Sequence, residues 1–468
     1  MTRLFLSIIF LFGSLHSFAQ KQNNIWYFGE KAGIDFNSGT AVALTNDSMD
    51  SFEGTAVISD TSGQLLFYTN GGKFQYWSGM FHGGIWNRNH WLMPNGSLDS
   101  AGGCNSSVQS SLIVPWPENP GLFYVFTTDC QENQMMGGFR YSVVDMALDG
   151  GLGDVTTKGI KILDSVAESI CGIKHTNNTD YWVIIHKLYN SSFYAYRITP
   201  TGIQAPVISD IGMPVSVNGG QMMSTIDGTK IGYCVTYKTM LFDFDASTGI
   251  LSAYKDLNKT SWGCAFSSNC RYFYTTSNDP PDSKIYQFDL NAADIAASAR
   301  AIHDIAHPYA PMQLGPDGKI YHVQNNGPNL ALDVINSPNT PDTLCDFVVG
   351  GFNLAGRKSV ASIPNFISGF YGQCFSESDV HPIKNNAIEA ITISPNPFSN
   401  SATIKFSNPE NNITRIAIYN VLGVMIDAIE NITSDNVVIE RKKLVPGLYY
   451  FQIIEKNNIR GSGKFIIE

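Results

Sequence analysis

The sequence is poor in charged residues and has no excess of basic ones. Only 15% of its residues are charged, and 30 Lys and Arg stand against 40 Asp and Glu, which gives a net charge of -10. The last eighty residues contain eight basic and eight acidic side chains, so the other 22 basic and 32 acidic ones carry the whole acidic surplus. Binding to nucleic acid or to an anionic membrane needs a basic stripe. Neither partner is predicted.

Long apolar runs are also missing, apart from one at the N-terminus. Arg3 precedes an apolar run at residues 4–12, and a small-x-small sequence at residues 17–19 predicts cleavage between Ala19 and Gln20. The alternative is a membrane anchor, but a span needs about 20 apolar residues. Residues 1–19 are therefore predicted to be a signal peptide, and no transmembrane segment is expected.

Catalytic signatures are absent as well. The sequence contains no Gly-x-Ser-x-Gly, His-Glu-x-x-His, Walker loop, Cys-x-x-Cys or sialidase-type Asp box, and no Gly-x-Gly-x-x-Gly opens a helix. A metal bound by His303, His307 and His322 is the alternative, although Pro308 favours turn and surface histidines there. No catalytic residue, cofactor or metal is predicted, and whether the protein is an enzyme stays open.

Helical periodicity is scarce, and the best helix candidate, residues 292–301, is short. Six stretches instead repeat one unit, a strand, a tight Asp-, Asn- or Gly-containing turn, and a second strand. These stretches are residues 55–69, 109–127, 170–185, 221–236, 262–276 and 311–323. Each second strand carries an aromatic residue soon after the turn: Phe67, Tyr124, Tyr181, Tyr233, Tyr272 and Tyr321.

This repetition predicts an all-β protein whose body, residues 20–375, is a β-propeller of about seven blades. Residues 360–366 form a last inner strand without a blade, while residues 25–29 and 33–37 form middle strands without an inner one. We therefore expect N- and C-terminal strands to close the ring together. Six or eight blades, or an open sandwich, are the alternatives.

The segment 389–468 alternates short β-runs with turns and predicts a small sandwich of its own. Its sequences Ser394-Pro395-Asn396-Pro397-Phe398, Leu444-Val445-Pro446-Gly447-Leu448-Tyr449 and Gly463-Lys464-Phe465 resemble the type A sorting domain of the type IX (Por) secretion system. The residues of this motif are Pro395, Asn396, Pro397, Gly423, Gly447, Tyr449 and Lys464.

The resemblance implies partners and a compartment. Such a domain is recognised in the periplasm by the type IX machinery and is removed by a sorting peptidase, here near a linker at residues 376–388. The body is then secreted to the outer-membrane surface or the extracellular space. Residues 24–29, 32–36 and 137–155 further resemble uncharacterised secreted propellers that carry this domain.

All eight cysteines lie between Cys104 and Cys374. In an exported chain an even number favours disulfides. Cys264 and Cys270 flank one predicted hairpin turn and are the candidate pair. Buried free thiols are the alternative.

Polar residues at the starts of the predicted inner strands are expected to converge on the central channel. They are Glu53, Gln109, Glu168, Gln221 and Gln313, with His175 or His186 from a neighbouring hairpin. They are candidate ligand-binding residues. Filling of the channel by hydrated polar or hydrogen-bonded side chains is the simpler interpretation.

A predicted loop at residues 74–107 offers a second candidate surface, because it carries Trp77, Trp86 and Trp91. Aromatic side chains in loops suit stacking on sugars or docking a protein. The alternative is that they cover the edge of a blade.

Three hypotheses follow. The first is an exported binding module for a glycan or a protein. The second is a propeller-type hydrolase or lactonase that uses Glu53 and Glu168, or His175 and His322, as acid, base or metal ligand. The third is a structural component of an extracellular adhesive matrix.

Overall fold

The computed structural model describes residues 21–76, 79–216, 219–277, 283–307, 309–324, 329–372, 374, 391–409, 411–420, 425–442, 444–455 and 458–468. The predicted signal peptide, 1–19, and the predicted linker, 376–388, lie outside these residues. The chain divides into two compact units, Met1–Ser376 and Glu377–Glu468. We call the first unit the body.

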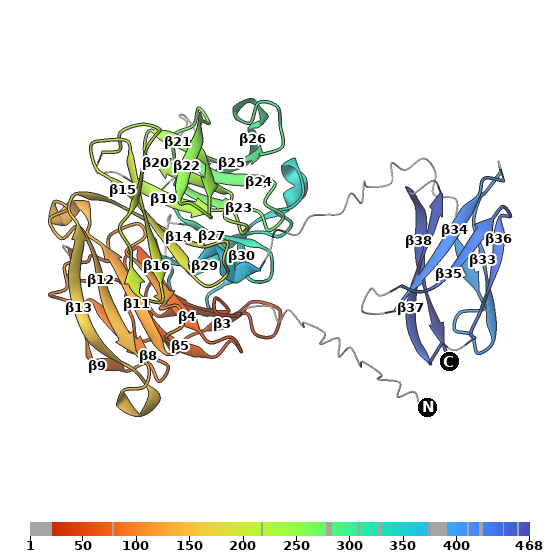
Figure 1. Cartoon of the computed structure of the whole chain (residues 1–468), viewed down its shortest axis with the longest axis horizontal. Helices are drawn as coiled ribbons and strands as arrows, with labels where there is room; N and C mark the ends of the chain where they lie inside the picture. Colours follow the sequence, from red (N-terminus) through yellow and green to blue (C-terminus); the bar gives the residue numbers. More distant parts are fainter. Residues whose placement is uncertain are drawn as a thin grey trace, which may run out of the picture. The chain divides into compact units, whose positions relative to one another are not determined.

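Seven sheets in the described part of the body follow one another around a ring (Figure 1). Five of them are each built from four or five consecutive strands. These are β10 (Ser111–Pro115), β11 (Leu122–Thr128), β12 (Phe139–Asp145) and β13 (Asp154–Leu163); β14 (Val166–Lys174), β15 (Tyr181–Lys187), β16 (Ser192–Thr199), β17 (Gly202–Ile203) and β18 (Val207–Asp210); β19 (Gly219–Ser224), β20 (Lys230–Val235), β21 (Lys238–Asp245) and β22 (Ile250–Asp256); β23 (Ser261–Phe266), β24 (Tyr272–Ser277), β25 (Ser283–Asp289) and β26 (Arg300–Ile305); and β27 (Met312–Leu314), β28 (Ile320–Val323), β29 (Ala331–Ile335) and β30 (Phe347–Asn353).

The two remaining sheets close the ring. One contains β1 (Ile25–Phe28), β2 (Ala32–Asp35) and β3 (Val42–Leu44), and the other contains β4 (Gly54–Ser59), β5 (Leu65–Thr69), β8 (Gly84–Asn87) and β9 (Leu92–Ser97). The last strand of the body, β31 (Ile363–Asn365), lies beside β1 and β27 but pairs in parallel with β4. The body is therefore a β-propeller whose terminal strands meet, as predicted, although the C-terminal strand bonds to the inner strand of the next blade.

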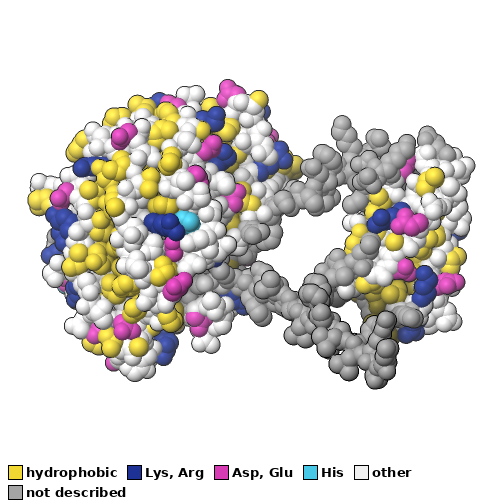
Figure 2. Space-filling view, in the orientation of Figure 1, with side chains coloured by type: hydrophobic (Ala, Val, Ile, Leu, Met, Phe, Trp, Pro, Cys, Tyr) yellow, Lys and Arg dark blue, Asp and Glu magenta, His cyan; other side chains and the backbone are white. Residues whose placement is uncertain are grey.

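Burial explains the order of the strands within a blade. All six residues of the inner strand β23 are buried, whereas half-buried and exposed residues alternate along much of the outer strand β13. An inner strand is covered on both faces by its neighbours, while an outer strand meets water along one edge, where polar side chains discourage further pairing. On the face shown in Figure 2, acidic and basic side chains are interspersed between hydrophobic ones.

Aromatic side chains fill the space between blades. Of the six aromatics that follow the repeated turns, Phe67, Tyr124, Tyr233, Tyr272 and Tyr321 are buried and Tyr181 is half-buried. Phe67 of one blade meets Phe123 of the next edge to face at 5.3 Å. At the closure of the ring, Trp26 packs against Tyr321 and Phe366 at 5.6 and 5.9 Å. Such pairs add to the burial energy of each sheet-to-sheet contact.

Two sequence-based predictions are wrong. Residues 292–301 do not form an α-helix, because only a 3-10 turn, η3 (Ala296–Ser298), precedes β26. Residues 74–107 are not mainly a loop either. They contain the hairpin of β6 (Phe74–Tyr76) and β7 (Gly79–Phe81) and the two outer strands of a blade, β8 and β9. The other 3-10 turns are η1 (Gln131–Asn133), η2 (Asp149–Gly151), η4 (Asp342–Cys345) and η5 (Ser368–Tyr371).

The described residues of the second unit form two sheets. Their strands are β32 (Thr392–Ser394), β33 (Ser401–Lys405) and β36 (Asn436–Glu440) in one, and β34 (Thr414–Tyr419), β35 (Met425–Ile432), β37 (Gly447–Glu455) and β38 (Asn458–Ile467) in the other. The side chain of Asn396 binds the backbone of the last strand, β38. Its Oδ1 accepts from the Ile466 N–H at 2.8 Å, and its Nδ2 donates to the Lys464 carbonyl at 3.3 Å. Tyr449 is buried and stacks on Phe465, whereas Gly423 lies outside the described residues.

Candidate channel mouth and its blind channel

The inner strands of the body begin at one end of the ring. The Gly54 N–H donates to the Ser107 carbonyl at 3.0 Å, and the Gln109 N–H donates to the Glu168 carbonyl at 3.2 Å. These bonds join the starts of β4, β10 and β14. Because neighbouring strands of a blade are antiparallel, the loops that join blades and the loops between second and third strands meet at this end. We call it the connection face, and the opposite end, with the tight hairpin turns, the turn face.

Two of the predicted channel residues cross the channel and bind the backbone of strands on its far side. Gln109 donates from Nε2 to the Met222 carbonyl at 3.2 Å, and its Oε1 accepts from the Met222 N–H at 2.8 Å. Gln221 makes the same pair of bonds to Met312 and also accepts from the Cys264 N–H. Each of these glutamines thus joins strands that are two blades apart.

The C-terminal segment of the body enters the channel from β31 and closes it toward the turn face. Asn365 donates to the carbonyls of Ser111 and Ile170, and Ile367 forms a parallel bridge with Gly172. Gly172 permits this approach, because a Cβ at that position would lie 2.9 Å from the Ile367 side chain. We call residues 365–372 and Cys374 the plug.

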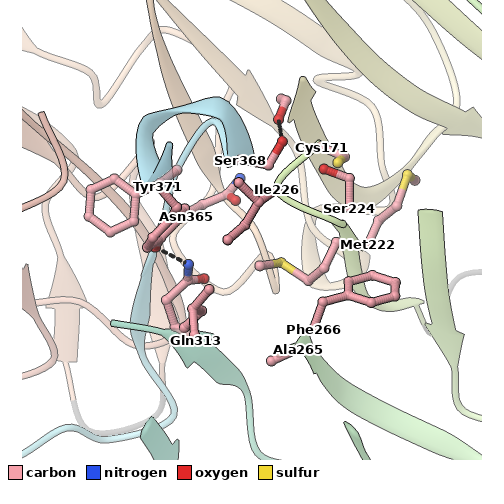
Figure 3. A pocket seen from close by; sticks show the side chains of 14 residues that line it. Cys171, Met222, Ser224, Ile226, Ala265, Phe266, Gln313, Asn365, Ser368 and Tyr371 are labelled. Carbon is pink, nitrogen blue, oxygen red and sulfur yellow. Dashed lines mark hydrogen bonds between the residues drawn. The ribbon is translucent and has the colours of Figure 1, made fainter. Parts of the chain in front are cut away.

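The rest of the plug is fixed by one hydrogen bond and one disulfide. Gln313, the third predicted channel glutamine, donates to the Tyr371 hydroxyl at 2.5 Å (Figure 3). Cys374 is bonded to Cys270 in the turn between β23 and β24, with a Cα–Cα distance of 5.5 Å. Beneath the plug a cavity of about 20 Å³ remains, lined by Cys171, Ser224 and Gln313 among others. That volume holds about one water molecule. This cavity therefore has no room for a sugar.

The predicted disulfide between Cys264 and Cys270 is wrong. Cys264 lies within β23 opposite Thr275, and its buried thiol is 3.4 Å from the Gln221 carbonyl, whereas Cys270 lies in the turn. A second disulfide joins Cys104 to Cys130. The thiols of Cys171, Cys234, Cys264 and Cys345 are free and buried.

Carboxyl groups gather near the starts of the inner strands, on the connection face. Glu168 is 6% exposed, Glu53 is half-buried, and Glu132 lies exposed at the rim. We call these three residues the acidic mouth. Burial raises the pKa of Glu168 to about 8, and the charge of Glu132 adds to this rise. Burial, with the charges of Glu168 and Glu132, also raises the pKa of Glu53 well above its ordinary range.

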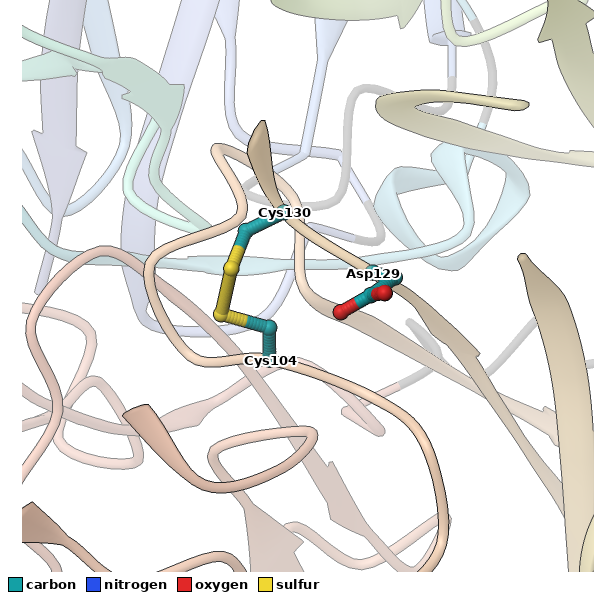
Figure 4. A group of neighbouring side chains, drawn as sticks. All are labelled: Cys104, Asp129 and Cys130. Carbon is teal, nitrogen blue, oxygen red and sulfur yellow. A yellow bond between two sulfur atoms is a disulfide. The ribbon is translucent and has the colours of Figure 1, made fainter. Parts of the chain in front are cut away.

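Hydrogen bonds and a disulfide hold the loops around the acidic mouth in place. Glu168 accepts from the Gln131 N–H at 2.8 Å, and the Ser106 hydroxyl donates to Glu132 at 3.0 Å. The disulfide Cys104–Cys130 lies beside Asp129 (Figure 4). This trio is not a metal site, because both sulfurs are oxidised and the Asp129 carboxylate accepts from Gly137 and Asn133.

The histidines do not join the acidic mouth. His175 lies on the turn face, where it accepts from the Asn177 N–H and stacks on Trp182 at 5.7 Å. His186 packs edge to face on Phe193 at 4.5 Å, and burial lowers its pKa to about 4. His322 is buried with its Nδ1 at 3.0 Å from Asp333. Among the described residues, neither His303 nor His322 belongs to a group of three possible ligands close enough together to hold a metal ion.

The three predicted tryptophans also lie apart from the acidic mouth or outside the described residues. Trp86 is half-buried on β8 and stacks at 5.8 Å on Tyr68 of the neighbouring strand β5, so it packs within its own blade. Trp91 is 65% exposed in the turn between β8 and β9, which places it on the turn face. Trp77 lies outside the described residues.

Four of the exposed apolar residues on the connection face lie in neighbouring loops and were not predicted from the sequence. Met136 and Tyr189 are 70% exposed, Tyr237 is 38% exposed and Met213 is 36% exposed. We call them the apolar arc. They lie in four separate loops with no shared motif. The sequence signal that could have identified them is their position directly after a second strand or before an inner strand of the repeat.

Comparisons with known proteins identify the second unit. Residues 392–468 match the family described as secretion system C-terminal sorting domain, so the chain carries a type IX sorting domain and is secreted to the cell surface or beyond. No curated protein matches the chain. Within the described residues, no helix is both long and apolar enough to cross a membrane.

Solved structures resemble the chain only distantly. A candidate 6-phosphogluconolactonase of Bacteroides uniformis is 12% identical, with 71% of this chain and 99% of that chain covered and a TM-score of 0.45. A second, from Bacteroides fragilis, is 10% identical, with 72% and 96% covered and a TM-score of 0.45. The Swd1 β-propeller domain of Myceliophteria thermophila is 9% identical, with 65% and 94% covered and a TM-score of 0.38. At these values the similarity carries no argument about activity.

Proposed function

Because the chain ends in a secretion system sorting domain, we propose that the propeller body is a binding module that engages a glycan or a protein outside the cell. One observation carries this proposal. The apolar arc and the acidic mouth share the loop between β11 and β12 on the connection face, whereas the plug ends at the disulfide to Cys270 on the turn face. The chain therefore departs from the body at the end opposite to the proposed binding surface.

The apolar arc is held as one surface by bonds between its loops. The Tyr189 N–H donates to the Val215 carbonyl at 2.7 Å, and the Tyr237 hydroxyl donates to the Pro214 carbonyl at 2.9 Å. Met135, next to Met136, packs in one buried cluster with Leu188 and Val215. Aromatic side chains lose little entropy on binding, and both aromatic and Met side chains are enriched where partners dock.

A hydrolase is the second candidate, and the state of Glu168 supports it. A carboxyl whose pKa is raised to about 8 keeps its proton at neutral pH and can act as a general acid. Hydrolysis of a lactone or glycoside panel by the wild-type body, abolished in Glu168→Gln, would favour this candidate over the binding module.

Replacing Tyr189 by alanine is expected to weaken binding at least fivefold, because the exposed ring offers a large contact area. The purified body would be tested on arrays of bacterial polysaccharides and extracellular matrix proteins. Leu344→Ala is the matched control, since Leu344 is 71% exposed but lies in a turn-face loop. Equal losses of affinity in both variants, or no binding to either array, would count against the connection face as the binding surface.

Deletion of residues 464–468 is expected to retain the protein in the periplasm and to lower its surface signal at least tenfold. The deletion removes the end of β38 and the backbone that Asn396 clasps. Protease accessibility on intact cells of a bacterium with a type IX system measures the effect. Lys405→Ala, an exposed change on β33, should leave the surface signal unchanged. A normal signal in the deletion would refute the role of this strand.

A further inference from the structure

One outer strand of the propeller lacks the features that protect the other blade edges. An edge strand exposes backbone N–H and C=O groups that can pair with another chain, unless charge, proline or a short length opposes it. The outer strands β13, β18, β22 and β26 each carry at least one charged residue, β9 carries Pro94, and β3 has only three residues. The outer strand β30 has seven residues, Phe-Val-Val-Gly-Gly-Phe-Asn, with neither charge nor proline.

The edge of β30 is exposed and apolar. Val348 and Val349 are 39% and 58% exposed, and Gly350 and Gly351 are exposed as well. Within the described part of the body, β30 is the last strand of its sheet and pairs only with β29. A bulge interrupts this pairing. Bulges are not the only protection in this chain, because the pairings of β13, β22 and β26 are interrupted too and these strands still carry charges.

The sequence of β30 fits an antiparallel copy of itself. Gly350 is the central residue of the strand, so an antiparallel pair centred there places Val348 opposite Phe352 of the second copy. Val348 and Phe352 lie on the same face of the sheet, because they pair with Val334 and Leu332, which are two residues apart. Aromatic and β-branched side chains that face each other across two strands stabilise a sheet. The glycines at the centre let the two backbones approach without a clash of side chains.

The two ends of β30 carry opposite charges. Asp342 and Asp346 lie exposed just before the strand, and Arg357 and Lys358 follow it. Lys358 already pairs with Glu30, whereas Arg357 donates only to a backbone carbonyl and forms no ion pair within the described residues. Antiparallel pairing brings the acidic start of one strand toward the basic end of the other. A parallel pair would bring like charges together, which is unfavourable.

We propose that β30 pairs with β30 of a second copy of this protein, so that two bodies form a dimer with its two-fold axis at Gly350. Each copy uses the same strand, as a closed two-fold dimer requires. Addition of a strand to an exposed sheet edge is a common mode of protein association. The contact lies on a blade edge, not on the apolar arc, and therefore goes beyond the proposed binding function. A dimer carries two apolar arcs and can link two partner molecules.

Sedimentation equilibrium of the full-length protein tests this proposal. We expect the average mass to rise from 51.4 kDa toward twice that value as the protein concentration increases. Val349→Lys should weaken the association at least tenfold, because the two new charges face each other as diagonal neighbours about 7–8 Å apart. Val349→Glu should weaken it as strongly, and an equimolar mixture of the two variants should regain the wild-type mass. Ile160→Lys, at a 45% exposed position of β13, should leave the association unchanged.

Other outcomes would overturn the inference. A mass of 51.4 kDa at every concentration would exclude the dimer. An undiminished dimer in Val349→Lys would place the contact on another surface. A mixture of the Lys and Glu variants that stays monomeric would show that the pairing is not two-fold symmetric. A continuous series of larger species would indicate unlimited association of exposed edges and not one closed pair.

Discussion

Replacing Glu168 by glutamine is expected to raise the free energy of unfolding of the body by about 4 kcal/mol at pH 7.5. In the folded protein burial raises the pKa of this carboxyl from 4.5 to about 8. The stability that depends on its protonated form is complete below pH 4.5 and is lost as the pH rises through 8. Glutamine is neutral throughout and retains an oxygen for the Gln131 N–H.

The effect should therefore depend on pH. The variant and the wild type should be equally stable near pH 4.5, and the difference should grow until about pH 8. Guanidinium unfolding of the body at pH 5, 6.5 and 8 measures this. Glu118→Gln makes the same chemical change at an exposed turn and should alter stability by less than about 0.5 kcal/mol. Parallel pH profiles for wild type and Glu168→Gln would contradict the raised pKa.

Removal of the disulfide between Cys270 and Cys374 by serine substitution is expected to lower the free energy of unfolding by about 4 kcal/mol. The bond closes a loop with a sequence separation of 104 residues, and it holds the end of the plug. Without it, the plug depends on the hydrogen bonds of Asn365 and Tyr371 and on the bridge at Ile367. Guanidinium unfolding under non-reducing conditions gives the stability.

Labelling of Cys171 distinguishes loss of the plug from general destabilisation. This free thiol lines the cavity beneath the plug. Its reaction with iodoacetamide in native buffer should accelerate when Cys270 and Cys374 are serines. Serines at Cys104 and Cys130, which close a loop of only 26 residues on the connection face, should not accelerate it. If the variant with serines at Cys270 and Cys374 kept the wild-type stability and Cys171 still did not react, the plug would not need the disulfide.

The propeller was predictable because its information is local. Each repeat places a turn between two strands and an aromatic residue just after it, and burial of Phe67, Tyr233 and Tyr321 between blades follows from that pattern. The sorting domain was predictable for the same reason, since its motifs are short runs in a fixed order. Asn396 belongs to such a run and clasps the last strand.

The plugged channel was not predictable, because it depends on contacts between distant parts of the chain. Gln109 binds Met222, and Cys270 binds Cys374, although nothing near either residue identifies its partner. The acidic mouth was predicted in part. Glu53 and Glu168 begin inner strands, whereas Glu132 reaches them from a loop of another blade. The spacing of Trp91 in the sequence likewise gave no sign that it lies on the turn face.

The disulfide at the end of the plug also determines how the body responds to mechanical force. A pull on the chain beyond Cys374 passes through the sulfur bond into the β23–β24 hairpin before it reaches β31. The parallel ladder between β31 and β4 is thereby spared from peeling, and the load enters a blade whose four strands share it. For a protein held by its C-terminal end against flowing liquid, this covalent bypass would keep the ring closed.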